Sequence, residues 1–215
     1  MAEAQKTEPL LAILTRQPVI PVVAVASAKE AVSLARALAA GGLPAIEITL
    51  RTPAALDAIR AVVAEVPEAI AGAGTILNPA QFAAAAEAGS RFIVSPGTTP
   101  SVIEAASDSD VPLLPGAASA SELMRALESG YELLKFFPAE QAGGAAFLKS
   151  IAPVFPAIRF CPTGGISTKN VGDYLALPNV VCVGGSWVAP KDALSAGDFD
   201  TVTRLAREAA ALKAR

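Results

Sequence analysis

Short apolar runs alternate with amphipathic stretches along almost the whole chain. The runs are rich in β-branched residues and nearly uniformly apolar, which is typical of parallel strands covered on both faces. Eight such runs recur at a spacing of roughly 20–25 residues, which indicates repeated strand–helix–strand units. They are PVIPVVAV (18–25), PAIEITL (44–50), AIAGAGT (69–75), RFIVS (91–95), VPLLP (111–115), YELLKFF (131–137), IRFCPT (158–163) and VVCVGG (180–185).

The stretches between the runs are predicted helices, because their apolar residues recur three and four positions apart and several end in glycine. Eight strand–helix repeats favour an α/β fold, a single (β/α)8 TIM barrel, over an open doubly wound sheet, and no GxGxxG follows the first run. Residues 4–16 are predicted to form an extra N-terminal helix that covers the barrel floor. No linker divides the sequence, so we expect residues 1–215 to form one domain.

Composition and charge narrow the classes of protein. Hydrophobic residues make up 53% of the chain, yet no apolar run approaches the ~20 residues of a membrane span. The N-terminal segment has no long apolar core and does not resemble a signal peptide. Cys161 and Cys182 lie in apolar runs without CxxC spacing, which indicates reduced thiols in a cytoplasmic protein. A net charge of −3 argues against nucleic acid as a partner.

The chain contains no histidine. Catalytic sites of the Ser-His-Asp and Cys-His types are therefore excluded, and so are zinc and iron sites built on imidazole. A magnesium site made of carboxylates stays open. Any acid–base chemistry must come from Glu, Asp, Lys, Tyr or water.

The active site of such a barrel lies where the strands end, so residues at these ends are the first candidates. The second run places Glu47 among apolar residues and Arg51 just past the strand. Alternation puts Glu47 and Ile46 on opposite faces, so Glu47 can point into the barrel. The alternative is a structural Glu–Arg pair at the rim. GAGT (72–75) and SPG (95–97) end the next two runs, either as ligand-binding turns or as ordinary tight turns.

Lys135 gives the sharpest signal. It is the only one of seven lysines inside a strand-like run, whereas Lys149 lies in a helical segment where its stem can follow the surface. Burial favours the neutral form of a lysine amine, which is the form that condenses with a ketone. The alternative is a strand-end lysine that reaches solvent or pairs with an acid.

The last two runs both end in paired glycines, in PTGGIS (162–167) and VGGSW (183–187). Backbone N–H groups in such turns suit an oxyanion, and the phosphate site of many barrels follows the seventh and eighth strands. The two turns therefore predict a phosphate site.

Together these motifs resemble the 2-keto-3-deoxy-6-phosphogluconate (KDPG) aldolase family, which also covers 4-hydroxy-2-oxoglutarate (KHG) aldolase activity. The resemblance spans residues 18–190 or so and implies a class I aldolase, a carbon–carbon lyase that forms a Schiff base. The matching stretches are PVIPVV, EITLRT, VPEAIAGAGTILNP, IVSPG, SELMRALESG, LLKFFPAE, RFCPTGGIS, DYLAL and VGGSWVAP.

The resemblance also implies roles for individual residues. Lys135 would form the Schiff base, and Glu47 would move protons. The substrate's keto acid end would be bound by Arg51, Thr75, Pro96, Gly97 and Phe137. The phosphate would be bound by Thr163, Gly164, Gly165, Gly185 and Ser186.

The implied reaction is the reversible cleavage of KDPG to pyruvate and glyceraldehyde 3-phosphate, with KHG as a second substrate. The resemblance further implies no metal or other cofactor, and a homotrimer. The galactonate epimer of KDPG is an alternative substrate. A sugar-phosphate isomerase or epimerase, or a silent binding module, could share the same phosphate-binding barrel. Trapping of pyruvate by borohydride would distinguish an aldolase from both.

Overall fold

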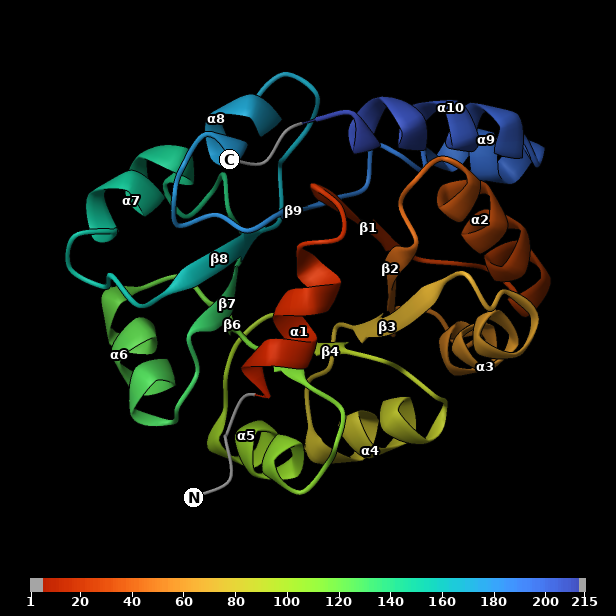
Figure 1. The fold of residues 1–215 in the computed structure, drawn as a ribbon. Coiled ribbons are helices and arrows are strands. Elements are labelled where there is room, and N and C mark those ends of the chain that lie inside the picture. The colour runs from red at the N-terminus through yellow and green to blue at the C-terminus, as the bar shows by residue number, and fades with distance from the viewer. Residues whose placement is uncertain (1–5, 213–215) are drawn as a thin grey trace.

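The computed structural model describes residues 6–212, in which helices and strands alternate along the chain. Figure 1 shows the helices arranged in a ring around the strands. The helices are α1 (Thr7–Leu14), α2 (Ala28–Ala40), α3 (Ala55–Glu65), α4 (Pro79–Glu87), α5 (Pro100–Ser107), α6 (Ala120–Glu128), α7 (Gly144–Ile151), α8 (Val171–Leu175), α9 (Lys191–Ala196) and α10 (Phe199–Ala210). The strands are β1 (Val19–Val23), β2 (Ala45–Thr49), β3 (Ile70–Gly74), β4 (Ile93–Val94), β5 (Leu113–Leu114), β6 (Gly116–Ala117), β7 (Leu133–Phe136), β8 (Arg159–Pro162) and β9 (Val183–Gly185).

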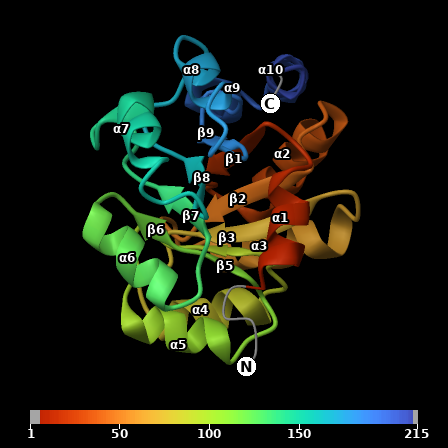
Figure 2. The same cartoon turned by 60° about the vertical axis from the view of Figure 1, so that its left-hand side comes forward.

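The paired strands are parallel, so the chain has an α/β fold as predicted. One sheet has the order β5-β4-β3-β2-β1-β9, and a second has the order β6-β7-β8. Two single bridges, Phe160 with Val180 and Thr163 with Gly184, connect β8 to the segment that contains β9. The view in Figure 2 again places the strands in the centre of the molecule, with helices on either side.

The fifth apolar run departs from the sequence prediction. One strand is expected over 111–115, but the structure has β5 before Pro115 and β6 after it. β5 pairs with β4, whereas β6 pairs with β7. Pro115 has no N–H to donate, and its carbonyl accepts a hydrogen bond of 2.9 Å from the backbone N–H of Lys135. The proline therefore lies where the chain passes from one sheet to the other.

Alternate residues of a strand face two different apolar clusters. In β7, Leu134 and Phe136 belong to the large cluster that includes the helices, and Leu133 belongs to a smaller cluster. Lys135 shares the face of Leu133, because side chains alternate along a strand. In β2, Ala45 belongs to the small cluster, and Glu47 lies on its face. The two charged residues therefore point into the space that the strands surround.

Helix α1 covers one end of this space. Leu10 and Leu14 are fully buried and pack with residues near the starts of strands, such as Ile20 and Phe92. Figure 1 shows α1 crossing the middle of the ring, on the side of the viewer. The helix spans 7–14 rather than the predicted 4–16, and residues 4 and 5 lie outside the described residues.

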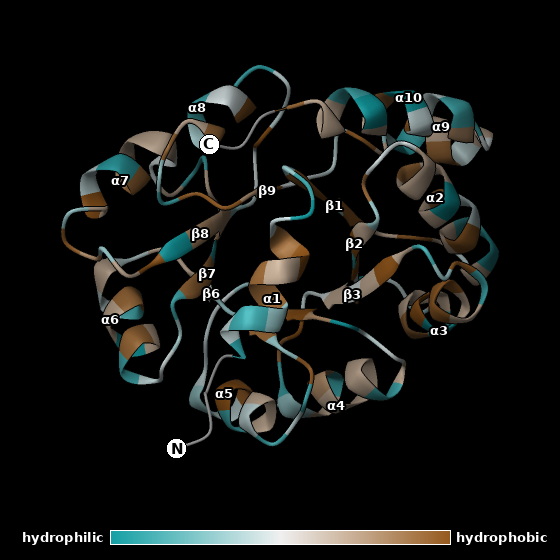
Figure 3. Cartoon of the chain, in the orientation of Figure 1, coloured by the Kyte–Doolittle hydropathy of each residue, from teal (hydrophilic) through white to brown (hydrophobic). Residues whose placement is uncertain are grey.

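Hydropathy follows the same arrangement. In Figure 3 apolar colour is concentrated on the strands, and polar patches lie on outer helices such as α2 and α10. Within residues 6–212, none of the helices combines the length and the apolar character that crossing a membrane requires.

Candidate active site

A cavity of about 320 Å³ opens where the strands end, on the side opposite α1. Nearly all of the residues predicted from strand ends line it. Those predicted residues are Glu47, Arg51, Thr75, Pro96, Lys135, Phe137, Thr163, Gly164, Gly165, Gly185 and Ser186. Gly97 follows Pro96 but is not part of the lining. The structure therefore brings together residues that are up to 139 positions apart, from Glu47 to Ser186.

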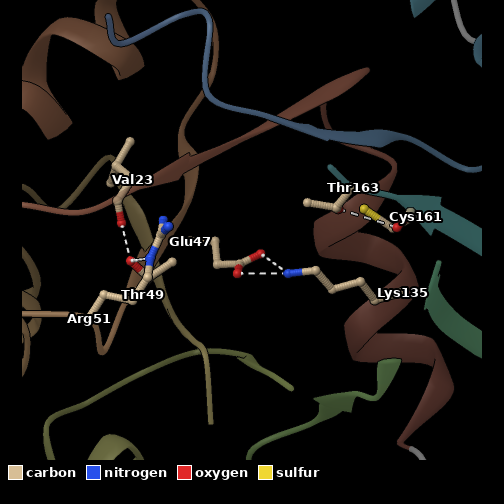
Figure 4. A network of polar contacts seen from close by, with 7 residues as sticks. All are labelled: Val23, Glu47, Thr49, Arg51, Lys135, Cys161 and Thr163. Carbon is tan, nitrogen blue, oxygen red and sulfur yellow. Dashed lines mark hydrogen bonds and ion pairs between the residues drawn. The ribbon is translucent and has the colours of Figure 1, made fainter. Parts of the chain in front are cut away.

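Lys135 and Glu47 form an ion pair at the bottom of the cavity. Lys135 Nζ lies 3.0 Å from Glu47 Oε1 and 3.3 Å from Oε2, and their side chains are only 6% and 4% exposed. Figure 4 shows the two side chains reaching toward each other from opposite sides of the site. Lys135 Nζ also lies 5.4 Å from the ring centroid of Phe137. A buried ammonium with a carboxylate as its hydrogen-bond acceptor can pass its proton to that carboxylate and become a nucleophile.

Glycine in β3 leaves room for the Glu47 carboxylate. Gly74 lies beside Glu47, and a Cβ at Gly74 would overlap Glu47 Oε1 and lie 2.6 Å from its Cγ. The GAGT segment therefore has a steric function that its sequence did not reveal. Thr75, which follows, has a φ of 63°, in the left-handed region that a threonine rarely adopts. Such backbone strain is often found at functional sites.

Arg51 is held by a neighbour that the sequence prediction missed. Its Nε donates a 2.9 Å hydrogen bond to Thr49 Oγ1, and that hydroxyl donates in turn to the carbonyl of Val23 at 2.8 Å. Figure 4 shows this chain of contacts beside Glu47. The terminal nitrogens of Arg51 stay available for a carboxylate, which guanidinium groups bind in a fork.

The first glycine turn presents its amides to the cavity. The carbonyls of Thr163, Gly164 and Gly165 accept hydrogen bonds of 2.9–3.1 Å from donors outside the turn. In a planar trans peptide the next N–H points the opposite way. The amides of Gly164, Gly165 and Ile166 therefore point away from these donors, and between residues 6 and 212 none of them donates to a protein acceptor. Three such amides suit an anion.

The second glycine turn lies next to the first, because Gly184 and Thr163 form a bridge. A Cβ at Gly184 would overlap Thr163 Oγ1, and a Cβ at Gly185 would overlap the ring of Trp187. Glycine is therefore required at both positions for steric reasons. Ser186 extends the lining toward solvent.

Four lining residues were not predicted from the sequence, namely Val22, Thr49, Ile166 and Gly184. Gly184 is the first glycine of VGGSW, the segment that predicted part of the phosphate site, so its neighbour Gly185 could have indicated it. Val22 and Ile166 are ordinary apolar residues and carry no sequence signal. Within the described chain, no cluster of three or more Cys, Asp or Glu side chains is arranged to hold a metal ion.

Comparisons with known proteins point to one family. The family model for KDPG and KHG aldolase matches residues 10–205. The KHG/KDPG aldolase of Escherichia coli is 55% identical over 197 residues, which cover 92% of each chain. The 2-dehydro-3-deoxy-phosphogluconate aldolase of Dickeya dadantii is 53% identical over 199 residues, 93% of each chain.

Solved structures are similar as well. The KDPG aldolase of Legionella pneumophila, solved with pyruvate captured as a covalent carbinolamine intermediate, is 46% identical. It superposes with a TM-score of 0.92 over 96% of this chain and all of that one.

Proposed function

The chain belongs to the KDPG and KHG aldolase family, and we propose that it cleaves KDPG to pyruvate and glyceraldehyde 3-phosphate as a class I aldolase. The observation that carries this proposal is the buried ion pair of Lys135 and Glu47 in a cavity with an anion-binding turn. A lysine in that environment supplies both the nucleophile and, through its partner, a proton acceptor.

The reaction begins at the substrate's C2 ketone. Glu47 takes a proton from the Lys135 ammonium, and the neutral amine attacks C2 to give a carbinolamine. Glu47 returns the proton to the departing hydroxyl, so water leaves and Glu47 is again a carboxylate. The resulting iminium can accept the electron pair of the C3–C4 bond. Because Glu47 Oε1 lies 3.0 Å from Lys135 Nζ, its carboxylate can also reach groups close to the new C–N bond.

Cleavage follows from the iminium. A carboxylate, assigned to Glu47, removes the proton of the C4 hydroxyl as the C3–C4 bond breaks. This step releases glyceraldehyde 3-phosphate and leaves the enamine of pyruvate on Lys135. Protonation of the enamine at C3 and hydrolysis of the iminium release pyruvate and restore the free lysine.

The rest of the cavity orients the substrate. Arg51 binds the carboxylate, with Thr75, Pro96 and Phe137 as further contacts at that end. The amides of the Gly164–Gly165 turn, with Thr163, Gly185 and Ser186, hold the remote phosphate. Gly97, which follows Pro96 outside the lining, stays a proposed substrate contact. Binding of the remote phosphate helps to align the reacting carbons.

KHG is a second candidate substrate, because the family model covers both activities and the E. coli relative carries both names. KHG shares the keto acid end of KDPG and lacks the phosphate. Lys135, Glu47 and Arg51 could act on it without the glycine turns.

The test is incubation with pyruvate and borohydride, followed by intact mass measurement and peptide mapping. We expect one stable adduct on Lys135, because borohydride reduces the iminium to an amine that cannot hydrolyse. Lys135→Ala should lose the adduct and almost all turnover, while Lys149→Ala, the matched control, should keep both.

An adduct on another lysine, or none with pyruvate well above millimolar, would contradict the mechanism and favour an isomerase-like barrel. Chiral analysis of the KDPG analogue formed in the reverse reaction would distinguish the gluconate from the galactonate epimer.

We further propose that the two sheets form one closed (β/α)8 barrel, with α1 as its extra N-terminal helix, and that residues 1–215 form a single domain. The bridges between β8 and the segment of β9 support closure at one edge of the two sheets. At the other edge, only Pro115 separates β5 in the first sheet from β6 in the second, which supports closure there.

A cytoplasmic location and a homotrimer are proposed on separate grounds. Cys161 and Cys182 are buried free thiols, and the hydrogen bond that the Cys182 thiol donates to Cys161, together with burial, raises the pKa of Cys182. Buried free thiols fit a reducing compartment. The trimer rests on the family resemblance, and light scattering would test it.

A further inference from the structure

Glu140 lies directly behind the first glycine turn. Its backbone N–H donates a 3.1 Å hydrogen bond to the carbonyl of Gly164. Its side chain packs so closely on Gly165 that a Cβ there would lie 2.6 Å from Glu140 Cγ. Glu140 does not line the cavity, so it contacts the turn only from outside.

Tyr174, in α8, fixes the position of the Glu140 side chain. The Tyr174 hydroxyl donates a short hydrogen bond to Glu140 Oε1, and the tyrosine is only 1% exposed. Burial and, after it, the contact with Glu140 raise the pKa of Tyr174, so the phenol stays protonated and remains a donor at working pH. Glu140, by contrast, is exposed, and without this hydrogen bond it would have many rotamers available.

Three hydrogen bonds hold the carbonyls of the turn, but none of them holds its amides, and the glycine backbone leaves these free to turn. Gly164 and Gly165 have φ angles of 105° and 76°, and glycine moves easily among several backbone conformations. Its amides can bind an anion together only if all three point the same way. A loose Glu140 carboxylate near the turn would also repel an anion.

We propose that Tyr174 and Glu140 are positioning residues for the phosphate end of the substrate. Tyr174 holds the Glu140 side chain against the outer face of Gly165, which keeps the amides of the turn directed into the cavity and keeps the carboxylate away from the phosphate. The inference rests on the proposed function, which assigns this turn to phosphate. It predicts that the Tyr174–Glu140 pair affects phosphorylated substrates and leaves the chemistry at Lys135 unchanged.

The chain provides a matched control for the test. Its two tyrosines, Tyr131 and Tyr174, are both fully buried, but the Tyr131 hydroxyl has no hydrogen-bond partner among the described residues. Tyr174→Phe and Tyr131→Phe each remove one buried hydroxyl. We expect Tyr174→Phe to raise the KM for KDPG, and the inhibition constant of inorganic phosphate, by roughly tenfold. Tyr131→Phe should change neither.

A second measurement distinguishes a positioning role of Tyr174 from a general loss of structure in the variant. Pyruvate lacks phosphate, so its borohydride trapping on Lys135 should proceed at the same rate in wild type and Tyr174→Phe. The kcat for KDPG should fall by less than the KM rises, because the reacting groups are untouched and only the alignment supplied by the phosphate is weakened. Glu140→Gln, which keeps an acceptor for the tyrosine, should retain a KM close to that of wild type, and Glu140→Ala should behave like Tyr174→Phe.

Several results would overturn the inference. An unchanged KM and phosphate inhibition constant in Tyr174→Phe would do so, and so would an equal loss of pyruvate trapping, which would indicate a structural role. If Tyr174→Phe fails to fold, Glu140→Ala, a substitution at an exposed position, tests the inference by the same two measurements. If the proposed function is wrong, the wild-type protein itself forms no pyruvate adduct. Calorimetry of phosphate binding to wild type and Tyr174→Phe would then still test the positioning role of Tyr174 and Glu140.

Discussion

At the scale of single residues, the buried ion pair of Lys135 and Glu47 is a feature that stability alone does not explain. Both side chains are nearly inaccessible, at 6% and 4% exposure. A buried ion pair is often no more stabilising than well-packed apolar residues, and removal of one partner can cost about 3–5 kcal/mol. The pair is therefore better explained by chemistry than by stability. Substitutions here should be judged by their effect on folding as well as on turnover.

Thr49 offers a prediction at the same scale. Thr49→Val removes the hydroxyl that accepts from Arg51 Nε and should loosen the guanidinium. We expect the pyruvate concentration for half-maximal borohydride trapping to rise roughly tenfold, because the proposed mechanism assigns the carboxylate of pyruvate to Arg51. Trapping of an aldehyde without a carboxylate should not change.

Thr52→Val is the matched control for this variant. The Thr52 hydroxyl also donates to a backbone carbonyl, that of Val25 at 2.7 Å, but it makes no hydrogen bond to Arg51. An equal effect of both variants on pyruvate trapping would refute the positioning role of Thr49.

These residues also show which parts of the site could be predicted from the sequence. Lys135 and Glu47 could be predicted because a charge inside an apolar strand is unusual. Thr49 could not, because threonine is an ordinary strand residue and its importance depends on Val23 in a neighbouring strand and on Arg51. The steric need for Gly74 likewise depends on a side chain from another strand.

At the scale of elements, the spacing of apolar residues predicted helices between the apolar runs, and helices lie there. Ser27, Asn78 and Ser119 each accept a hydrogen bond from the backbone N–H three residues later, which starts α2, α4 and α6. Such caps lie within the sequence of the helix itself. The split of the fifth run at Pro115 was not predicted, because it depends on which strands lie to either side.

Helix packing gives a prediction for Gly41, at the end of α2. A Cβ there would overlap the side chain of Ala206 and lie 2.8 Å from the carbonyl of Thr203, both in α10. Gly41→Ala should therefore force α2 and α10 apart and lower the free energy of unfolding by about 1–3 kcal/mol. Denaturant titration measures this loss.

Gly172→Ala in α8 is the control, because a Cβ at Gly172 meets no atom within 4 Å. This variant should be neutral, or more stable by up to about 1 kcal/mol, since alanine favours a helix over glycine. Equal destabilisation by both variants would show that the α2–α10 contact is not the cause.

At the scale of the whole molecule, the two ends of the strands have different tasks. The cavity with Lys135 opens at one end, and α1 closes the other through Leu10 and Leu14. Periodicity predicted the α/β fold and the approximate position of this helix. Its boundaries could not be predicted as well, because they depend on which residues find an apolar surface to cover.

Leu10→Ala tests this separation. Leu10 is fully buried, so its truncation should lower the free energy of unfolding by about 2–5 kcal/mol. The kcat and KM measured well below the unfolding temperature should stay at wild-type values, because the site lies at the other end of the strands. Leu11→Ala, on the same helix but only half-buried, should cost clearly less. A large change in KM for Leu10→Ala would show that the two ends are coupled.

The two groups of cavity residues lie far apart in the sequence, which is useful when the protein is engineered for synthetic carboligation. The lysine, glutamate and arginine come from β7, β2 and the segment after β2, whereas the paired-glycine turns follow β8 and belong to β9 and its exit. In the proposed mechanism, pyruvate activation and recognition of the aldehyde are thus encoded in different stretches of the gene. Libraries that randomise Thr163, Ile166 and Ser186 and keep the four glycines would change which aldehyde is accepted while leaving the nucleophile intact. A carboligation catalyst for unphosphorylated aldehydes could be sought there first.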